Sequence, residues 1–319
     1  MGTDDAPSSE IAGAVAAVDA DPALHVMLVG DKPALAAPLS RFPRQERISV
    51  VHAPDRIAFS DAPASVLRRR PRSSISVGLG LQAAGEADAF VSAGSTGAVM
   101  AASLLRLRPL QGVDRPALAT LFPTDGGLTL VADIGANIEC KPHQLVQFAR
   151  LGSIYMQDLQ GMSAPRVGLL NVGTEAEKGT EVLQAAYGIL AASDLNFVGN
   201  VEGRDILLHA CDVLVCDGFT GNILLKFYES VAAFMVRKLA PGVEWIGQPD
   251  EVDDLLRDLD YAEYGGAPLL GVNGVTVICH GRSSPRAISA GIGVAVRAVR
   301  SGLVAHMARD LAGPGMSHA

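Results

Sequence analysis

A repeated unit constrains this fold more than any other feature of the sequence. A short apolar run ends in glycine, asparagine or aspartate and is followed by a helix-like pattern. Such runs occupy residues 24–30, 47–53, 88–94, 128–135, 166–173, 195–201, 212–218 and 274–281. Short β-branched runs separated by helical patterns are typical of βα units. The sequence therefore predicts an α/β fold with a mostly parallel sheet whose strands are buried on both faces.

The length of 319 residues allows one large α/β domain or two lobes. We treat residues 1–319 as one α/β domain, in which the polar, proline-interrupted stretch within 223–268 forms a peripheral helical lobe. The sequence lacks an apolar run of about 18 residues and has an acidic N-terminus without a signal-like apolar region. We therefore expect a cytoplasmic protein.

Charge and cysteine content narrow the class of partner. The net charge of −8 argues against nucleic acid as a partner. The four cysteines form no C-x-x-C pair and have no matching histidine spacing, so no metal site is predicted. Cys211, Cys216 and Cys279 lie in apolar, strand-like segments, and we interpret them as buried packing residues.

The candidate chemistry lies where the predicted strands end. Parallel sheets bind ligands beyond the carboxyl ends of their strands, next to helix N-termini. The sequence has no G-x-G-x-x-G with a following acid, no G-x-x-x-x-G-K-[ST] and no G-x-S-x-G, which disfavours nicotinamide, P-loop and serine-hydrolase chemistry. The strand ends instead read SAGSTG (92–97), DIGAN (133–137), NVGTEAEKG (171–179), NVEGRD (200–205), DGFTGN (217–222) and HGRSS (280–284).

Six small-residue turns with hydroxyl and amide groups favour an anionic or acyl-oxygen ligand. Exposed backbone N–H groups and Ser/Thr hydroxyls bind anions without net positive charge. Each turn alone is equally consistent with an ordinary βα connection. The cations near these turns are Lys141, Lys178, Arg204 and Lys226. Each can neutralise phosphate or polarise a carbonyl, or is alternatively an ordinary surface residue. His280 is either a proton donor or a structural histidine, and the acids Asp133, Glu175, Glu202 and Asp217 are alternatively helix caps.

Several long strings resemble one known family. They are DAFVSAGSTGAVMAAS, VADIGANIECKP, NVEGRDI, DVLVCDGFTGN and EYGGAPLLGVNG, which run in order between residues 55 and 300. They are similar to the bacterial phosphate acyltransferases of phospholipid synthesis, also called acyl-ACP:phosphate transacylases or PlsX. The resemblance implies a three-layer α/β/α Rossmann-like fold of the isocitrate and isopropylmalate dehydrogenase superfamily. It also implies a homodimer that associates loosely with the membrane face.

The resemblance further implies the reaction and its partners. An acyl chain moves from the thioester of acyl carrier protein to inorganic phosphate, with no metal or organic cofactor. Phosphate is already a nucleophile, so the protein has to position two anionic partners and stabilise the oxyanion. On this basis the catalytic candidates are Lys178, Asn200, Arg204, Lys226 and His280. The substrate-binding candidates are Ser92, Gly94, Ser95, Thr96, Gly97, Asp133, Gly135, Asn137, Lys141, Asn171, Gly173, Glu175, Glu202, Gly203, Asp217, Gly218 and Asn222.

Two segments are candidates for contact with partners. Carrier proteins are acidic, so docking requires a basic patch, and the densest cluster is Arg68, Arg69, Arg70 and Arg72, followed by Arg106 and Arg108. A solvated face is the alternative. Residues 223–239 carry apolar side chains at helical spacing. They line an acyl groove, a dimer face or a membrane contact, or else pack in the core.

The sequence departs from the family pattern in places. Family members open with a strand and D-A-M-G-G-D-x-A-P, whereas this sequence opens 1-MGTDDAP-7, which we expect to reflect a late assigned start or a lost strand. Ser95 stands where the family has asparagine, and Thr174 and Ala176 alter the turn around Glu175. Two alternatives therefore stay open. One is a diverged acyltransferase that uses acyl-CoA or another acceptor, and the other is a non-catalytic homologue that binds acyl groups or carrier protein.

Overall fold

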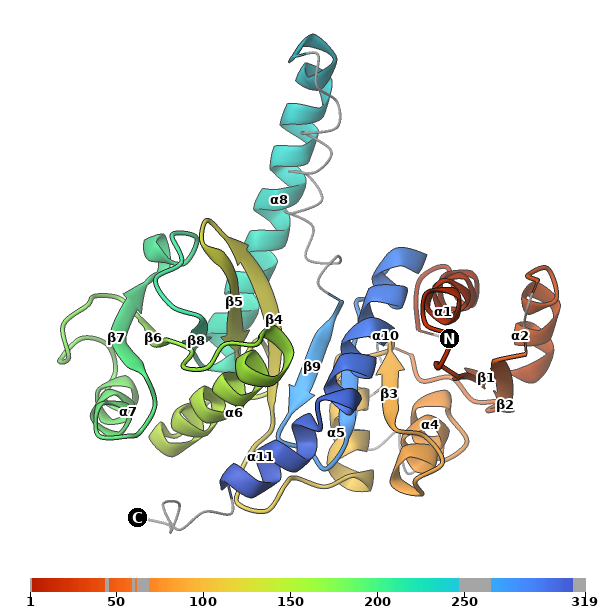
Figure 1. Ribbon diagram of the computed structural model, residues 1–319, viewed down its shortest axis with the longest axis horizontal. Helices are drawn as coiled ribbons and strands as arrows, with labels where there is room; N and C mark the ends of the chain where they lie inside the picture. The colour runs from red at the N-terminus through yellow and green to blue at the C-terminus, as the bar shows by residue number, and fades with distance from the viewer. Residues whose placement is uncertain (1, 44–45, 59–60, 62–68, 247–264, 312–319) are drawn as a thin grey trace. The chain divides into compact units, whose positions relative to one another are not determined.

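The chain forms two compact units, which we describe separately. The computed structural model describes all residues except 1, 44–45, 59–60, 62–68, 247–264 and 312–319 (Figure 1). The first unit combines Met1–Pro116 with Tyr264–Ala319, and the second is Ala117–Glu263. The sequence-based treatment of 1–319 as a single domain stays a prediction.

The first unit contains two sheets. Strands β1 and β2 pair in parallel, and a separate set has the order β3-β10-β9, in which β10 is parallel to β3 and antiparallel to β9. Its elements are α1 (Ser8–Ala20), β1 (Val26–Gly30), α2 (Lys32–Leu39), β2 (Ile48–His52), α4 (Ser74–Ala83), β3 (Ala89–Ser92), α5 (Thr96–Arg106), β9 (Ala267–Leu270), β10 (Val275–Ile278), α10 (Pro285–Arg300) and α11 (Leu303–Leu311).

The second unit is built on strands in the order β4-β5-β8-β6-β7. Only the β4–β5 hairpin is antiparallel, and β5, β8, β6 and β7 all run in parallel. Its elements are β4 (Ala117–Thr124), β5 (Gly127–Ala132), α6 (Pro142–Gln160), β6 (Val167–Asn171), α7 (Glu181–Ala191), β7 (Phe197–Glu202), the 3₁₀ turn η1 (Gly203–Asp205), β8 (Val213–Val215) and α8 (Gly218–Ile246).

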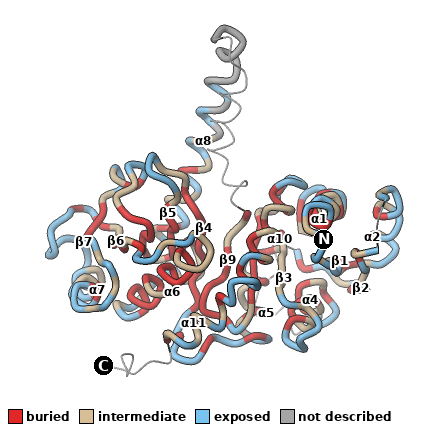
Figure 2. Tube along the Cα trace, viewed as in Figure 1, coloured by how far each residue is buried: buried red, intermediate tan, exposed pale blue. Residues whose placement is uncertain are grey.

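The predicted α/β class is confirmed, and its core lies where the sequence is most apolar. Strands β4, β5 and β8 and helix α6 form the buried centre of the second unit (Figure 2). Helix α6 starts with Pro142 in its first turn and ends at Gly161, whose φ of 70° is the left-handed conformation that glycine adopts without strain. The sheet is therefore held by an amphipathic helix with a defined beginning and end.

Some elements differ from the sequence-based prediction. The strand β4 was not predicted because Pro123 and the two alanines at positions 117 and 119 weaken the strand pattern. The predicted lobe 223–268 begins as part of the long helix α8, and residues 247–264 lie outside the described residues. Cys211, Cys216 and Cys279 are buried, as predicted, and burial raises the pKa of Cys211 and of Cys279 to about 12. In the described part of the chain no single helix is long and apolar enough to cross a bilayer, although the bent pair α10 and α11 passes that test jointly.

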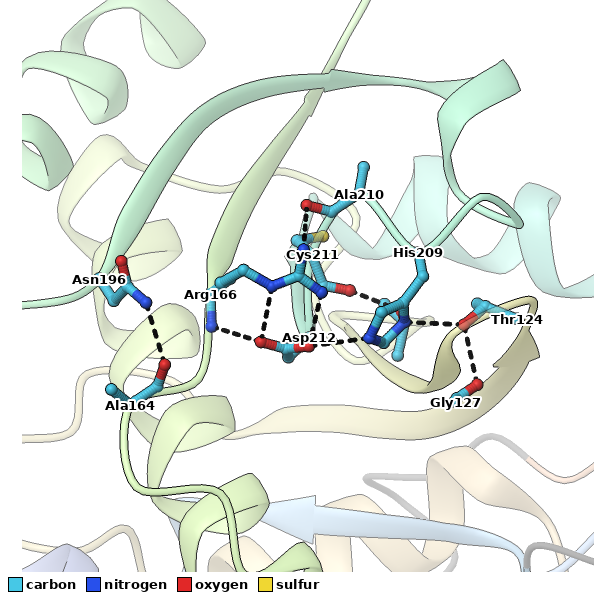
Figure 3. A network of polar contacts seen from close by, with 10 residues as sticks. Thr124, Gly127, Ala164, Arg166, Asn196, His209, Ala210, Cys211 and Asp212 are labelled. Atoms are coloured by element: carbon cyan, nitrogen blue, oxygen red, sulfur yellow. Dashed lines mark hydrogen bonds and ion pairs between the residues drawn. The ribbon is translucent and has the colours of Figure 1, made fainter.

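A polar network ties the amino ends of β6 and β8 to the β4–β5 hairpin (Figure 3). The backbone N–H and Nε of Arg166 donate to Asp212 Oδ2 at 2.7 and 3.1 Å, and Arg166 Nη2 donates to Oδ1 at 2.9 Å. His209 Nε2 lies 3.1 Å from Asp212 Oδ1, and its Nδ1 lies 2.8 Å from Thr124 Oγ1. Burial opposes ionisation of Asp212, but the hydrogen bonds and charge of Arg166 and the charge of His209 outweigh it, so the pKa of Asp212 is lowered.

Replacing Asp212 tests how much this network stabilises the fold. We expect Asp212→Asn to lower the free energy of unfolding by about 1–3 kcal/mol at pH 7, because Arg166 and His209 lose a charged acceptor. A lowered pKa in the folded state means that the stabilisation is complete above the unfolded value of about 4 and is lost as the pH falls through the folded value. Urea unfolding at several pH values between 7 and 3 should show the difference between the two proteins shrinking below about pH 4.

Asp194→Asn is the matched control. Asp194 pairs with Arg150 but is 74% exposed, and exposed pairs contribute little, so its removal should cost less than about 1 kcal/mol. Equal losses in the two variants would contradict a special role for the network around Asp212.

Candidate functional site

The predicted turns lie at the carboxyl ends of the parallel strands within each unit. In the second unit β5, β8, β6 and β7 are parallel, so the turns DIGAN, DGFTGN, NVGTEAEKG and NVEGRD all leave the same edge. In the first unit β3 and β10 are parallel, so SAGSTG and HGRSS share an edge there. Each unit therefore presents its own set of candidate residues.

Asp133 is the centre of the DIGAN turn and is fully buried. Its Oδ1 accepts hydrogen bonds from the backbone N–H groups of Leu118, Gly135 and Ala136 at 3.1, 3.1 and 3.0 Å. Its Oδ2 accepts from the backbone N–H and the side-chain Nδ2 of Asn137 at 2.7 and 2.8 Å. Five donors thus satisfy one buried carboxylate, and these hydrogen bonds hold the backbone of the turn in place.

The backbone of the same turn contacts the start of helix α8. The N–H of Gly218 donates to the carbonyl of Asn137 at 2.8 Å, and a Cβ added at Gly221 would lie 1.9 Å from the carbonyl oxygen of Asp133. Only glycine allows this approach, which explains the G-x-x-G spacing in DGFTGN. Asp217 caps the helix through Thr220, whose N–H and Oγ1 donate to it at 2.8 and 2.9 Å.

These contacts determine which groups of the DIGAN and DGFTGN turns are buried and which are accessible. Burial raises the pKa of Asp133, and the N–H donors of Ala136, Asn137 and Gly135 counteract part of that rise. Because its carboxylate is buried and hydrogen-bonded, Asp133 holds the conformation of the turn and is not exposed to a ligand. Gly135 has a φ of 141° and lies against Asn222, which is exposed in the first turn of α8. The backbone of the turn and Asn222 are therefore its accessible parts.

Two asparagines at neighbouring strand ends hold the NVGTEAEKG loop. Asn171 Nδ2 donates to the carbonyl of Lys178 at 3.1 Å, and its Oδ1 accepts the N–H of Val172 at 2.8 Å. Asn200 Nδ2 donates to the carbonyl of Glu175 at 2.8 Å, while its buried Oδ1 has no hydrogen-bond partner. Both side chains therefore position the loop backbone. The signal for this role in the sequence is an asparagine at the end of β6, Asn171, and another within the last three residues of the adjacent strand β7, Asn200.

The four candidate cations of the second unit fall into two groups. Arg204 lies in η1, which begins at Gly203, and its Nη2 is 2.6 Å from Glu202 Oε2. Lys226 Nζ is 2.8 Å from Glu229 Oε2. Within the described residues, the exposed Lys141 and Lys178 have no carboxylate partner. A Cβ at Gly173 would lie 2.9 Å from Lys178 Cγ and 3.0 Å from Glu175 Oε2. Lys178 and Glu175 thus fold over Gly173 at the carboxyl end of β6, and Lys141 precedes α6.

In the first unit the SAGSTG turn leads into helix α5. Ser92 Oγ accepts the N–H of Gly94 at 3.1 Å, and the backbone of Ser95 accepts the first helical bond, from Val99 at 2.9 Å. Ser95 is 8% exposed, and its side chain makes no capping hydrogen bond. The N–H groups in the first turn of α5, which includes Thr96 and Gly97, have no helical acceptor, as at any helix start. The turn therefore offers backbone donors to an anion.

His280 lies in the turn after β10. Its Nδ1 accepts the N–H of Arg282 at 3.1 Å, and its carbonyl accepts the N–H of Ser283 at 2.9 Å. Since Nδ1 acts as an acceptor, the neutral ring carries its proton on Nε2, which is the nitrogen that can donate. The described residues contain no cluster of three His, Cys, Asp or Glu side chains suited to a metal ion.

Substitution of Asp133 tests its scaffolding role. Asp133→Asn leaves one acceptor oxygen for five donors and points an amide toward buried N–H groups. We therefore expect a loss of at least about 2 kcal/mol in the free energy of unfolding. Chemical denaturation measures this loss, and Asp125→Asn, in the exposed β4–β5 turn, is the control that should change it by less than about 0.5 kcal/mol. Normal stability of Asp133→Asn would exclude the proposed dependence of the turn on this carboxylate.

Comparison with known proteins identifies the family. Residues 1–306 match the model of the family described as "Fatty acid synthesis protein". The phosphate acyltransferase of Desulforamulus reducens is 46% identical over 311 residues, covering 95% of this chain and 93% of that protein. The phosphate acyltransferase of Pelotomaculum thermopropionicum is 45% identical over 312 residues, covering 95% and 91%.

Solved structures support the fold at lower identity. The EutD phosphotransacetylase from Staphylococcus aureus aligns with a TM-score of 0.61 and 15% identity, covering 92% of this chain and 91% of that one. A phosphotransacetylase from Streptococcus pyogenes aligns with a TM-score of 0.62 and 15% identity, covering 92% of both chains. These likenesses agree with the Rossmann-like fold expected from the resemblance. Together with the family match, the close similarity to curated phosphate acyltransferases over nearly the whole chain shows that this chain belongs to the fatty acid synthesis protein family and is an acyltransferase.

Proposed function

We propose that this acyltransferase moves a fatty acyl group from acyl carrier protein to inorganic phosphate, giving acyl phosphate for phospholipid synthesis. The similarity to proteins named phosphate acyltransferase supports acyl transfer to phosphate. The structural observation that supports the proposal is the chemistry of the strand ends in the described residues. Glycine-rich turns there offer backbone N–H donors, and Lys141 and Lys178 have no carboxylate partner. Such a surface is suited to an anionic acceptor and a polarised carbonyl.

The reaction is a substitution at the thioester carbonyl. A phosphate oxygen attacks the carbonyl carbon, the C–S bond breaks, and the carrier thiol leaves as a thiolate that takes up a proton. Phosphate is a sufficient nucleophile, so no serine or cysteine ester is needed. The main task of the protein is to hold the two anionic reactants together and to neutralise the oxyanion of the tetrahedral intermediate.

Within the second unit, Lys178 is the residue best placed for this task. Its ammonium has no carboxylate partner among the described residues, and its loop is held by the amides of Asn171 and Asn200. Arg204 and Lys226 already lie against Glu202 and Glu229, so a ligand would have to compete with a carboxylate for each of them. In the first unit, the N–H groups at the start of α5 have no helical acceptor and offer a separate anion site.

One assay tests the proposal. Purified protein is mixed with long-chain acyl carrier protein and phosphate, and both free thiol and hydroxylamine-trapped acyl phosphate are followed. We expect thiol release that depends on phosphate and matches the acyl phosphate formed. Release from acyl-CoA alone would identify a diverged acyltransferase. Absence of release from both donors, with carrier protein still bound, would identify a non-catalytic binding protein.

Lys178→Ala tests the role of the unpaired lysine. Loss of a cation that acts on transition-state charge should lower kcat by roughly 100-fold with little change in stability. Steady-state kinetics with acyl carrier protein and phosphate measures this effect. Lys32→Ala, an exposed lysine in α2, is the matched control and should keep kcat within about twofold. A near-normal kcat in Lys178→Ala would remove this lysine from the reaction.

The donor protein requires a docking surface, and the arginine cluster remains our candidate. Arg68 lies outside the described residues. Arg70 is occupied, since it donates to the carbonyl of Arg56 and lies 3.7 Å from Asp61, whereas Arg69 and Arg72 are exposed. Carrier proteins are acidic, so the two exposed arginines are the better contacts.

Charge reversal tests this docking surface. Arg69→Glu with Arg72→Glu should raise KM for acyl carrier protein by roughly tenfold, since like charges then oppose binding, and leave kcat nearly unchanged. Activity with acyl-CoA should not change. Arg41→Glu, an exposed arginine after α2, is the control. An equal effect on both donors would show that these arginines do not recognise the carrier protein.

We further propose a homodimer in the cytoplasm that touches the membrane face peripherally. Helix α8 carries exposed apolar side chains spaced three or four residues apart along one stripe, namely Phe219, Ile223, Phe227, Val231, Phe234 and Met235. A stripe of this kind on a single helix is suited to a matching helix of a second copy, because pairing would bury it. This stripe accounts for part of the apolar pattern predicted at 223–239, whereas Tyr228 in the same segment is buried and stacks on Phe122.

A further inference from the structure

Three turns at the carboxyl edge of the second unit each expose a large apolar side chain. Ile138 follows the DIGAN turn after β5, Val172 comes directly after β6, and Phe219 is the second residue of α8, after β8. Their exposed fractions are 63%, 79% and 58%. One exposed apolar side chain is ordinary on a protein surface, whereas several at one place indicate a binding surface.

The order of the strands places the three turns next to one another. Strand β8 lies between β5 and β6 (Figure 1). Neighbouring strands are about 5 Å apart, so the ends of β5 and β6 are separated by about 10 Å, with the start of α8 between them. We call Ile138, Val172 and Phe219 the edge patch.

Backbone hydrogen bonds hold the edge patch in its exposed position. Val172 N–H donates to Oδ1 of the buried Asn171 at 2.8 Å. The carbonyl of Asn137, the residue before Ile138, accepts the N–H of Gly218 at 2.8 Å. That bond joins the turn that carries Ile138 to the first residue of α8. The apolar groups are therefore preorganised, and a ligand can cover them without rearrangement of the backbone.

Apolar and cationic groups occur together at this edge. Ile138 lies three residues before Lys141, and Val172 lies six residues before Lys178 in the NVGTEAEKG loop. Neither lysine has a carboxylate partner among the described residues. Two turns thus each combine an exposed apolar side chain with an unpaired ammonium. A ligand that matches this combination has an oxygen-rich group bonded directly to a hydrocarbon.

The acyl group of an acyltransferase has this composition. Its carbonyl oxygen gains negative charge in the reaction and requires a cation or N–H donors close by. The carbons that follow the carbonyl are apolar and gain free energy when they leave water. The polar part of the site and an apolar surface must therefore be adjacent, as they are at this edge.

A second copy of the chain is the alternative occupant, since Phe219 also begins the apolar stripe of α8. A protein surface that covered Val172 would also cover the loop of Lys178 and remove an unpaired ammonium from water. That is strongly unfavourable without a counter-charge. An acyl group covers the apolar side chains and brings its own oxygens to the lysine. The rest of the stripe, from Ile223 onward, stays available for a second copy.

We propose that the edge patch is a specificity subsite that binds the acyl carbons next to the thioester carbonyl and favours longer acyl groups over acetyl. This inference rests on the proposed function, because it names the part of the donor that this edge recognises. Each methylene that the patch covers should raise kcat/KM roughly fourfold until the patch is filled.

The double variant Ile138→Ser/Val172→Ser of the full chain tests the subsite. Acetyl, butyryl, octanoyl and palmitoyl carrier proteins serve as donors, and phosphate-dependent thiol release gives kcat/KM for each. We expect the ratio of kcat/KM for palmitoyl over acetyl to fall by at least roughly tenfold. Both positions are exposed, so Tm should stay within about 2 °C of the wild type.

Leu207→Ser/Leu208→Ser is the matched control. These leucines are 48% and 64% exposed, and the carbonyl of Leu207 accepts the N–H of Asp125 in the β4–β5 turn, which precedes β5 at the amino edge. Because this pair lies away from the edge patch, its loss should leave the palmitoyl-to-acetyl ratio within about twofold of the wild type.

Binding of cis-parinaric acid, a fluorescent fatty acid, separates failure of the subsite from failure of the proposed function. We expect its Kd to rise at least roughly fivefold in the Ile138→Ser/Val172→Ser variant. If the wild type transfers no acyl group and the variant still shows this rise, the proposed function is wrong and the subsite stands. An unchanged palmitoyl-to-acetyl ratio in an active variant would overturn the subsite and leave the function standing. Failure of the wild type to bind the probe would overturn the subsite as well.

Discussion

The buried carboxylate of Asp133 is the interaction on which the second unit depends. Its five hydrogen bonds reach the start of β4 and the whole DIGAN turn, and the turn in turn receives Gly218 and the close approach of Gly221. The carboxylate therefore fixes the start of β4 and the turn, and the backbone of that turn contacts the first residues of α8. A carboxylate is suited to this because it accepts several N–H groups without donating any.

The two edges of the sheet in the second unit use charge in opposite ways. At the amino edge Arg166, Asp212 and His209 neutralise one another, and the hydrogen bonds are directed inward. At the carboxyl edge the asparagines bond to the loop backbone and leave the ammonium of Lys178 without a carboxylate partner in the described region. Neutralised charge stabilises structure, whereas unpaired charge is available to a ligand. This contrast, rather than residue type alone, is the basis on which we propose Lys178 as a functional group and Asp212 as a structural one.

The same contrast explains what the sequence could predict. Strand runs that end in small turns predicted the parallel sheet and the location of the candidate residues, because both depend on local pattern. Sequence could not separate Lys178 from Arg204 and Lys226, because their pairing with Glu202 and Glu229 depends on side-chain geometry. It also left Asp133 open between ligand and cap, since burial is a tertiary property. The strand β4 was missed because its alanines and Pro123 give a weak strand pattern, and only its antiparallel pairing with β5, a tertiary contact, fixes it as a strand.

The first residues of the chain link helix α1 to the turns of the first unit, and Gly2 packs so closely on Ala93 and Gly94 that an added Cβ would lie 2.4 Å from both. Gly2 and Thr3 donate to the carboxylate of Glu10 at 2.8 and 2.9 Å, and Asp4 N–H donates to the carbonyl of Gly281. Burial opposes ionisation of Glu10, but the positive chain terminus and these N–H groups lower its pKa to about 2. The segment after Gly2 thus contacts both SAGSTG and HGRSS.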